Sequence, residues 1–195
     1  MKKLHTLLAI GLLPASSLFG NLMMNADFAA GIDSWFVFDG GGGPGEIGDP
    51  VGAGYVSISG NAATVNAATN TEVNFYQEFA GTLTPGMEYT FTVEIDNLSL
   101  VGAAPTALIW SKGFSSTYAW LDEFPNAPLS EGLNTITFTP TGDGSNIYQV
   151  GVLFNVAEGS SLDFMNPTLI PEPGTYALIF AAVGLGLVLL RRRRR

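Results

Sequence analysis

Residues 90–96 alternate strictly between polar and apolar side chains, and Phe91, Val93 and Ile95 fall on one face. This two-residue period is typical of a half-buried antiparallel strand, because successive side chains of a strand point to opposite faces. The same pattern recurs at 135–139, and no part of residues 21–170 shows a sustained helical period. Further strands are predicted at 22–24, 35–38, 55–59, 73–79, 106–110, 118–121, 147–155 and 162–170. The sequence therefore predicts an all-β body.

The predicted strands are short, and turn-forming residues separate them, as at Thr84-Pro85-Gly86. A series of short strands with such turn signals favours two packed antiparallel sheets. The chain contains no cysteine, but a body of about 150 residues can bury roughly 70% of its unfolded surface without disulfides. We expect residues 21–170 to form one antiparallel β-sandwich.

Acidic and basic residues are unevenly distributed along the chain. Residues 21–170 hold 16 aspartates and glutamates, and Lys112 is their only basic residue. Such a body repels nucleic acid phosphates, so nucleic acid is not an expected partner. The chain has no cysteine, and its only histidine is His5. Thiol chemistry, Ser-His-Asp catalysis and Cys/His metal sites are therefore excluded from the body.

The first 20 residues have the composition of a secretory signal peptide. A basic start at Lys2 and Lys3 precedes an apolar run at 7–13. This order is typical of export signals, and a buried N-terminal helix is the alternative. We predict passage through the Sec translocon and removal of residues 1–20 by signal peptidase. Cleavage after Ser17, among small residues, is also open.

The C-terminal end of the chain is apolar and then strongly basic. Residues 174–190 contain no charged side chain, and as a helix they extend about 25 Å, close to the thickness of the hydrocarbon core. Five arginines follow, Arg191, Arg192, Arg193, Arg194 and Arg195, and the positive-inside rule places them in the cytoplasm. We predict one transmembrane helix that leaves residues 21–170 outside the inner membrane.

A short motif precedes this predicted helix. Pro171, Glu172 and Pro173, then the apolar segment and the terminal arginines, resemble the PEP-CTERM sorting tail of exported proteins in Gram-negative bacteria that make extracellular polysaccharide. The resemblance covers residues 171–195. It implies that exosortase, a membrane protease-transpeptidase, cuts near the motif. It also implies a transient inner-membrane anchor, followed by transfer to the cell surface or the extracellular matrix.

Three segments of the body carry a second resemblance. They are Asn21-Leu22-Met23-Met24-Asn25-Ala26-Asp27-Phe28 followed by Gly31 and Trp35, Phe75-Tyr76-Gln77-Glu78-Phe79 followed by Leu83-Thr84-Pro85-Gly86-Met87-Glu88-Tyr89-Thr90-Phe91, and Leu162-Asp163-Phe164-Met165-Asn166-Pro167-Thr168-Leu169. They are similar to motifs of carbohydrate-binding modules with a galactose-binding-like jelly roll. The resemblance implies a jelly-roll sandwich with Trp35 in its core.

Many modules of this kind hold a structural calcium ion through an acid after the opening phenylalanine and an aspartate on the last strand. The first of these positions is Ala29 in this chain, and the second is Asp163. The resemblance therefore leaves calcium open, with Asp163 and Asp27 as candidate ligands. No other cofactor is expected.

Three aromatic residues form the candidate ligand-binding site. Tyr118 and Trp120 share one face of a predicted strand, and Trp110 lies one short loop away. The apolar faces of sugar rings stack well on aromatic side chains. These three residues are therefore predicted to bind a polysaccharide, and packing of the same residues in the core is the alternative.

We predict an exported, non-catalytic protein that binds extracellular polysaccharide. A structural envelope or matrix protein without a specific ligand is the first alternative. A glycoside-acting enzyme is the second, because such enzymes use two carboxyl groups. The adjacent acids Asp122 and Glu123 would point to opposite faces of a strand, which argues against that alternative.

Overall fold

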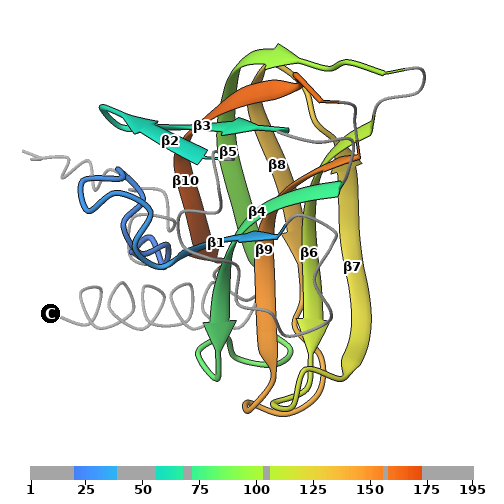
Figure 1. Cartoon of the computed structure of the whole chain (residues 1–195). Coiled ribbons are helices and arrows are strands. Elements are labelled where there is room, and N and C mark those ends of the chain that lie inside the picture. The colour runs from blue at the N-terminus through green and yellow to red at the C-terminus, as the bar shows by residue number, and fades with distance from the viewer. Residues whose placement is uncertain (1–19, 39–55, 68–71, 103–105, 156–157, 173–195) are drawn as a thin grey trace, which may run out of the picture. The chain divides into compact units, whose positions relative to one another are not determined.

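The computed structural model describes residues 20–38, 56–67, 72–102, 106–155 and 158–172 of the chain. One compact unit, residues 21–172, contains the ten described strands. The strands form two five-stranded sheets that face each other (Figure 1). The predicted signal peptide, apart from Gly20, and residues 173–195 lie outside the described residues. Among the residues that are described, no helix is long and apolar enough to cross a membrane.

Each sheet is built from strands that are mostly distant in sequence. Sheet A has the order β1 (Trp35–Phe38), β4 (Glu72–Ala80), β9 (Ile147–Asn155), β6 (Thr106–Phe114) and β7 (Trp120–Pro128). Sheet B has the order β2 (Val56–Ser59), β3 (Ala62–Asn66), β10 (Ser161–Pro171), β5 (Tyr89–Ser99) and β8 (Gly132–Phe138). Every described pairing is antiparallel. The predicted all-β, antiparallel two-sheet architecture is confirmed.

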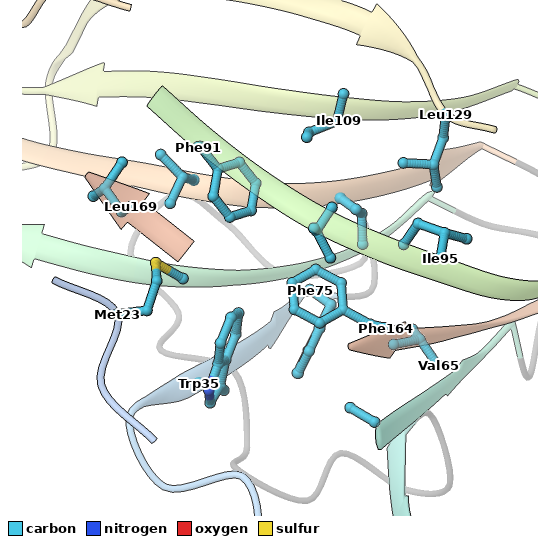
Figure 2. Close-up of a cluster of buried hydrophobic side chains, with 14 of the residues drawn as sticks. Met23, Trp35, Val65, Phe75, Phe91, Ile95, Ile109, Leu129, Phe164 and Leu169 are labelled. Atoms are coloured by element: carbon cyan, nitrogen blue, oxygen red, sulfur yellow. The ribbon is translucent and has the colours of Figure 1, made fainter. Parts of the chain in front are cut away.

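The core lies between the two sheets and is rich in aromatic rings. Trp35 of β1 stacks on Phe75 of β4, with ring centroids 4.9 Å apart. Phe164 of β10 meets both rings edge-on, at 5.1 and 5.2 Å. Figure 2 shows these three residues among the other buried side chains. Trp35 is 2% exposed, so its predicted place in the core is confirmed.

The alternation of polar and apolar residues at 90–96 predicted a strand, and in β5 the same residues alternate between the outer face and the core. Phe91, Val93 and Ile95 are fully buried, whereas Thr90 and Thr92 are half-buried on the outer face. Burying an apolar side chain of this size stabilises a fold by about 1.5–3 kcal/mol. The apolar face of β5 is therefore one of the main contributions to the core.

The predicted strand at residues 22–24 is wrong, because side-chain amides bind the backbone of this segment. The backbone N–H of Met24 donates to Gln77 Oε1, and Gln77 Nε2 donates to the Met24 carbonyl, both at 2.8 Å. Asn21 Oδ1 likewise accepts a hydrogen bond from the Met23 N–H at 3.0 Å. Because these side chains satisfy backbone groups of Met23 and Met24 that a neighbouring strand would otherwise bind, the segment forms no strand, although the Leu22 N–H donates to the Leu169 carbonyl of β10 at 2.9 Å.

Other strand predictions also differ from the structure. The strand β3 (Ala62–Asn66) was not predicted, because the small side chains of Ala62 and Ala63 carry little hydrophobic signal. The predicted strand at 118–121 begins only at Trp120. Tyr118 lies in the turn before it, with a φ of 59°.

Candidate functional site

The outer face of sheet A carries a row of aromatic side chains. Phe75 of β4 points into the core, so its neighbour Tyr76 points outward. The strand register aligns Tyr76 with Phe36 of β1 and, across Gly151 of β9, with Trp110 of β6. The ring centroids of Phe36 and Tyr76 are 5.6 Å apart, and those of Tyr76 and Trp110 are 5.8 Å apart. We call this surface, with its neighbouring polar groups, the aromatic face.

Gly151 permits the close contact across the centre of this row. A Cβ atom at this position would lie 2.1 Å from the Phe75 carbonyl oxygen and 2.6 Å from the Tyr76 Cα. Both obstacles are backbone atoms of β4, which cannot rotate away as a side chain can. A glycine is therefore required for β9 to pass beneath the Tyr76 and Trp110 rings.

The turn between β6 and β7 places Tyr118 over the aromatic face. Ser115 Oγ accepts hydrogen bonds from the backbone N–H groups of Thr117, at 3.2 Å, and Ala119, at 3.0 Å. The N–H of Tyr118 donates to the Ser115 carbonyl at 2.9 Å. In this turn the Tyr118 side chain reaches toward β4, where its hydroxyl donates to Glu78 Oε1 at 2.7 Å.

Glu78 is the centre of a polar network on the same face. Its second oxygen, Oε2, accepts a hydrogen bond from Gln149 Nε2 at 3.1 Å. The hydrogen bond to Glu78 raises the pKa of Tyr118 to about 12, and burial, with a smaller contribution from the Glu78 charge, raises the pKa of Tyr76 to about 12. Both phenols therefore stay protonated well above neutral pH, and the Tyr118 proton is donated to Glu78.

Lys112 lies between the two tryptophans of the face. Its Nζ atom is 4.5 Å from the centroid of the Trp110 ring and 6.0 Å from that of Trp120. An ammonium over an indole ring makes a favourable cation–π contact. Trp120 is 53% exposed, and Phe114 supports it edge-on with ring centroids 5.4 Å apart. Trp120 is therefore the most accessible aromatic surface of the site.

Among the side chains that the structure describes, two buried polar atoms on the face have no hydrogen-bond partner. They are the donor Trp110 Nε1 and the acceptor Asn74 Oδ1. Asn74 lies two residues before Tyr76 on β4, and its Nδ2 donates to Glu72 Oε1 at 2.7 Å. A buried polar atom without a partner is costly. A ligand hydroxyl, which both donates and accepts, is one group that can satisfy atoms of this kind.

The structure brings the three predicted ligand-binding residues to one end of sheet A. Trp110 and Trp120 flank Lys112, and the Tyr118 ring contacts Phe114 with centroids 6.3 Å apart. Trp110 is only 3% exposed, yet it lies outside the core cluster between the sheets. Tyr118 and Trp120 do not share a strand face, because Tyr118 belongs to the turn.

The sequence reasoning missed the other members of the aromatic face. Phe36, Tyr76, Glu78 and Gln149 were not among the predicted site residues. The two-residue period of β4 carried a signal, since it places Tyr76 and Glu78 on the face opposite Phe75. Their contacts with β1, β6, β9 and the turn before β7 depend on the sheet order, which the period does not reveal.

The described donors around the two predicted calcium ligands fall short of a calcium site. Asp163 Oδ1 accepts a hydrogen bond from Thr64 Oγ1 at 2.5 Å, and its Oδ2 accepts one from Asn97 Nδ2 at 2.6 Å. Asp27 Oδ1 accepts from the Ala29 N–H at 3.2 Å. Calcium takes six to eight oxygen ligands, and the described residues contain no cluster of three acidic, histidine or cysteine side chains. Calcium binding stays a prediction from the resemblance.

The chain resembles solved structures in fold. The enzymatically active domain of tailspike protein 4 from bacteriophage CBA120 matches 78% of this chain with a TM-score of 0.53 and 11% sequence identity. The two chains share a fold. The match covers 21% of the tailspike chain, so this chain spans about a fifth of its length. No protein-family model and no curated protein sequence matches the chain.

Carbohydrate-binding modules with a β-sandwich fold are also among the structural neighbours. TmCBM61, solved in complex with β-1,4-galactotriose, has a TM-score of 0.47 and 13% identity, and the match covers 78% of this chain and 99% of the module. The second family 16 carbohydrate-binding module has a TM-score of 0.48 and 17% identity, and the match covers 76% of this chain and 99% of the module.

Proposed function

We propose that this protein is an exported, non-catalytic protein that binds an extracellular polysaccharide on the aromatic face of sheet A. The observation that carries the proposal is the row of Phe36, Tyr76 and Trp110, which ends beside the exposed ring of Trp120. Stacked rings contribute about 0.5–1.5 kcal/mol each beyond the area that they bury. A sugar stacked on the exposed Trp120 ring therefore corresponds to weak binding, with a dissociation constant of about 1 mM or higher.

The polar groups of the face suit a hydroxyl-rich ligand. Trp110 Nε1 in the aromatic row and Asn74 Oδ1 beside it are a buried donor and a buried acceptor without a partner among the described residues. The Tyr118 hydroxyl donates to Glu78, so its oxygen lone pairs are the part that can accept a hydrogen bond from a sugar hydroxyl. The resemblance of residues 21–170 to carbohydrate-binding modules points to the same class of ligand.

The hydrogen bonds of Glu78, an acid of the face, fit a non-catalytic role. Both carboxylate oxygens of Glu78 accept hydrogen bonds from neutral side chains, Tyr118 and Gln149. A glycoside hydrolase needs one carboxylic acid that gives a proton to the leaving group and a second carboxylate that attacks or activates water. Glu78 is instead held in place as a structural acceptor.

The test compares two exposed side chains on opposite sheets. Trp120→Ala removes the most exposed ring of the aromatic face, and we expect at least a fivefold loss of affinity on a glycan array, because stacking on Trp120 is lost. Leu133→Ala is the matched control, since Leu133 is 72% exposed on β8 of sheet B, and it should bind like the wild type. If the wild-type protein retains no glycan, the structural-protein alternative replaces the proposal.

The proposal includes sorting by the C-terminal tail. The sandwich ends within the Pro-Glu-Pro motif, where Pro171 is paired with Tyr89 and the Glu172 N–H donates to the Glu88 carbonyl at 2.8 Å. The folded body therefore reaches the predicted membrane segment without an intervening linker domain. Exosortase would act there and release the body toward the cell surface or matrix.

A further inference from the structure

Among the described strands, only β5 runs beside the last residues of β10. The strand β3 pairs with residues 161–165 of β10, whereas β5 continues to Pro171. Backbone groups of β10 that point away from β5 therefore need partners of another kind after Met165. This end of β10 leads directly into the Pro-Glu-Pro motif, whose first residue is Pro171.

The side-chain amide of Asn21 takes the place of a neighbouring peptide group at this edge. Its Nδ2 donates to the Pro167 carbonyl at 3.0 Å, and its Oδ1 accepts a hydrogen bond from the Leu169 N–H at 2.9 Å. The Leu22 N–H donates to the Leu169 carbonyl, also at 2.9 Å. An amide suits this position because it donates and accepts at once. Both backbone groups of Leu169 are thus bound by the N-terminal segment.

The next two residues fix the same segment to the opposite sheet. Met23 is 7% exposed and packs in the core, where Figure 2 shows it together with Leu169. Gln77 of β4, which is fully buried, binds both the N–H and the carbonyl of Met24 at 2.8 Å. Residues 21–24 therefore connect β10 of sheet B to β4 of sheet A.

We propose that residues 21–24 form a clasp that keeps the end of β10 closed and so confines proteolytic processing to the chain beyond Pro171. Without the clasp, β5 alone would hold residues 167–171, and a strand end with fewer hydrogen bonds opens more often. Each opening exposes these residues to a protease, because proteases cleave the transiently opened chain. The consequence for processing rests on the proposed sorting at the Pro-Glu-Pro motif, whereas the clasp itself is measurable without exosortase.

The first test measures the local opening of β10 in the purified full-length protein in detergent. Asn21→Ala removes the two side-chain hydrogen bonds to β10, so we expect amide hydrogen exchange at residues 168–170 to become about tenfold faster. A protease of broad specificity should cut between residues 167 and 171 faster by about the same factor. Exchange in β6, which reports on the whole fold, should keep its wild-type rate.

Met24→Ala is the matched control, from the same segment. The Met24 side chain is 52% exposed, and Gln77 binds only its backbone, so this variant should exchange like the wild type at residues 168–170. Unchanged exchange at these residues in Asn21→Ala would overturn the clasp. Equal acceleration in β6, or failure of Asn21→Ala to fold, would make Asn21 a support of the whole sandwich instead. Equal acceleration by Met24→Ala would assign the effect to side-chain packing, and the clasp would again be wrong.

The second test follows processing in the native host, by mass spectrometry of the C-terminus of the surface protein. We expect part of the Asn21→Ala protein to end between residues 167 and 171, whereas the wild type and Met24→Ala end beyond Pro171. Faster exchange with an unchanged C-terminus would show that the clasp does not confine processing. If the wild-type surface protein keeps its tail, the proposed sorting and its confinement by the clasp both fail, whatever the exchange rates.

Discussion

Gly151 is the single residue on which the geometry of the aromatic face depends most. A Cβ at this position would collide with backbone atoms of Phe75 and Tyr76, at 2.1 and 2.6 Å. Relief of the collision requires β9 to move away from β4 at the centre of sheet A. The contact between the Tyr76 and Trp110 rings would then be lost.

We expect Gly151→Ala to lower the free energy of unfolding by about 1–3 kcal/mol or more, as overpacked positions do. The measurement is the melting temperature of residues 21–172 by circular dichroism. Gly144→Ala is the control, because a Cβ at Gly144 would meet no atom within 4 Å. Equal melting temperatures for the two variants would show that β9 and β4 do not approach as closely as described.

The raised pKa values of two tyrosines predict a loss of stability at alkaline pH. The pKa of Tyr118 is raised from 10.0 to about 12 by its hydrogen bond to Glu78, and that of Tyr76 is raised from 10.0 to about 12 chiefly by burial. A group whose folded-state pKa is raised stabilises the fold below its unfolded pKa, and this contribution is lost as the pH rises through the folded pKa. The loss therefore falls between about pH 10 and pH 12.

The measurement is the urea midpoint of unfolding from pH 8 to pH 12. We expect the urea concentration at the midpoint to stay constant up to about pH 10 and to fall above that pH. Tyr118→Phe removes one of the two phenols, so its midpoint should decline less steeply over the same range. A wild-type midpoint that stays level to pH 12 would contradict the described environment of both phenols.

At the scale of the elements, the strands with alternating side chains could be predicted from the sequence. The alternation of Phe91, Val93 and Ile95 with polar residues predicted β5, because a two-residue period depends only on the local order of side chains. The strand β3 was missed because Ala63 is a small residue whose burial is decided by its partner β10. Tyr118 was placed in a strand because the hydrogen bonds of the Ser115 turn do not appear in a hydrophobicity pattern.

The candidate site could be predicted only in part, for a related physical reason. Trp110 and Trp120 are close in sequence, and the hairpin of β6 and β7 brings them together around Lys112. Tyr76 joins them only because β9 lies between β4 and β6 with a glycine at position 151. Pairing between segments so distant in sequence is set by the whole fold, so side-chain spacing could not reveal it.

The end of β10 makes a specific prediction about sorting. Pro171 is buried and paired with Tyr89, and the Glu172 amide is bound to Glu88. A protease that needs an extended, accessible segment would therefore cut after Glu172. In the native host we expect mass spectrometry of the surface protein to find a C-terminus at Glu172 or a few residues beyond it. Recovery of a mature surface protein that still carries residues 174–195 would refute sorting by this tail.

At the scale of the whole molecule, the two sheets have different surfaces. Sheet A presents aromatic rings, a lysine and unpartnered polar atoms on its outer face. Sheet B presents threonines and acids, such as Thr92, hydrogen-bonded to Thr168, and Glu94, hydrogen-bonded to Asn166. The account therefore assigns ligand binding to one face of the sandwich.

The most direct test of this account is to map the bound glycan on the protein by nuclear magnetic resonance. The isotopically labelled body, residues 21–172, is titrated with the glycan that the array selects, and backbone amide and tryptophan indole shifts are followed. The account predicts that the indole N–H signals of Trp110 and Trp120 shift, together with amides of β4, β6 and β9, while β5 and β8 stay unchanged. Shifts confined to sheet B, or saturable binding that leaves both indole signals unmoved, would contradict it.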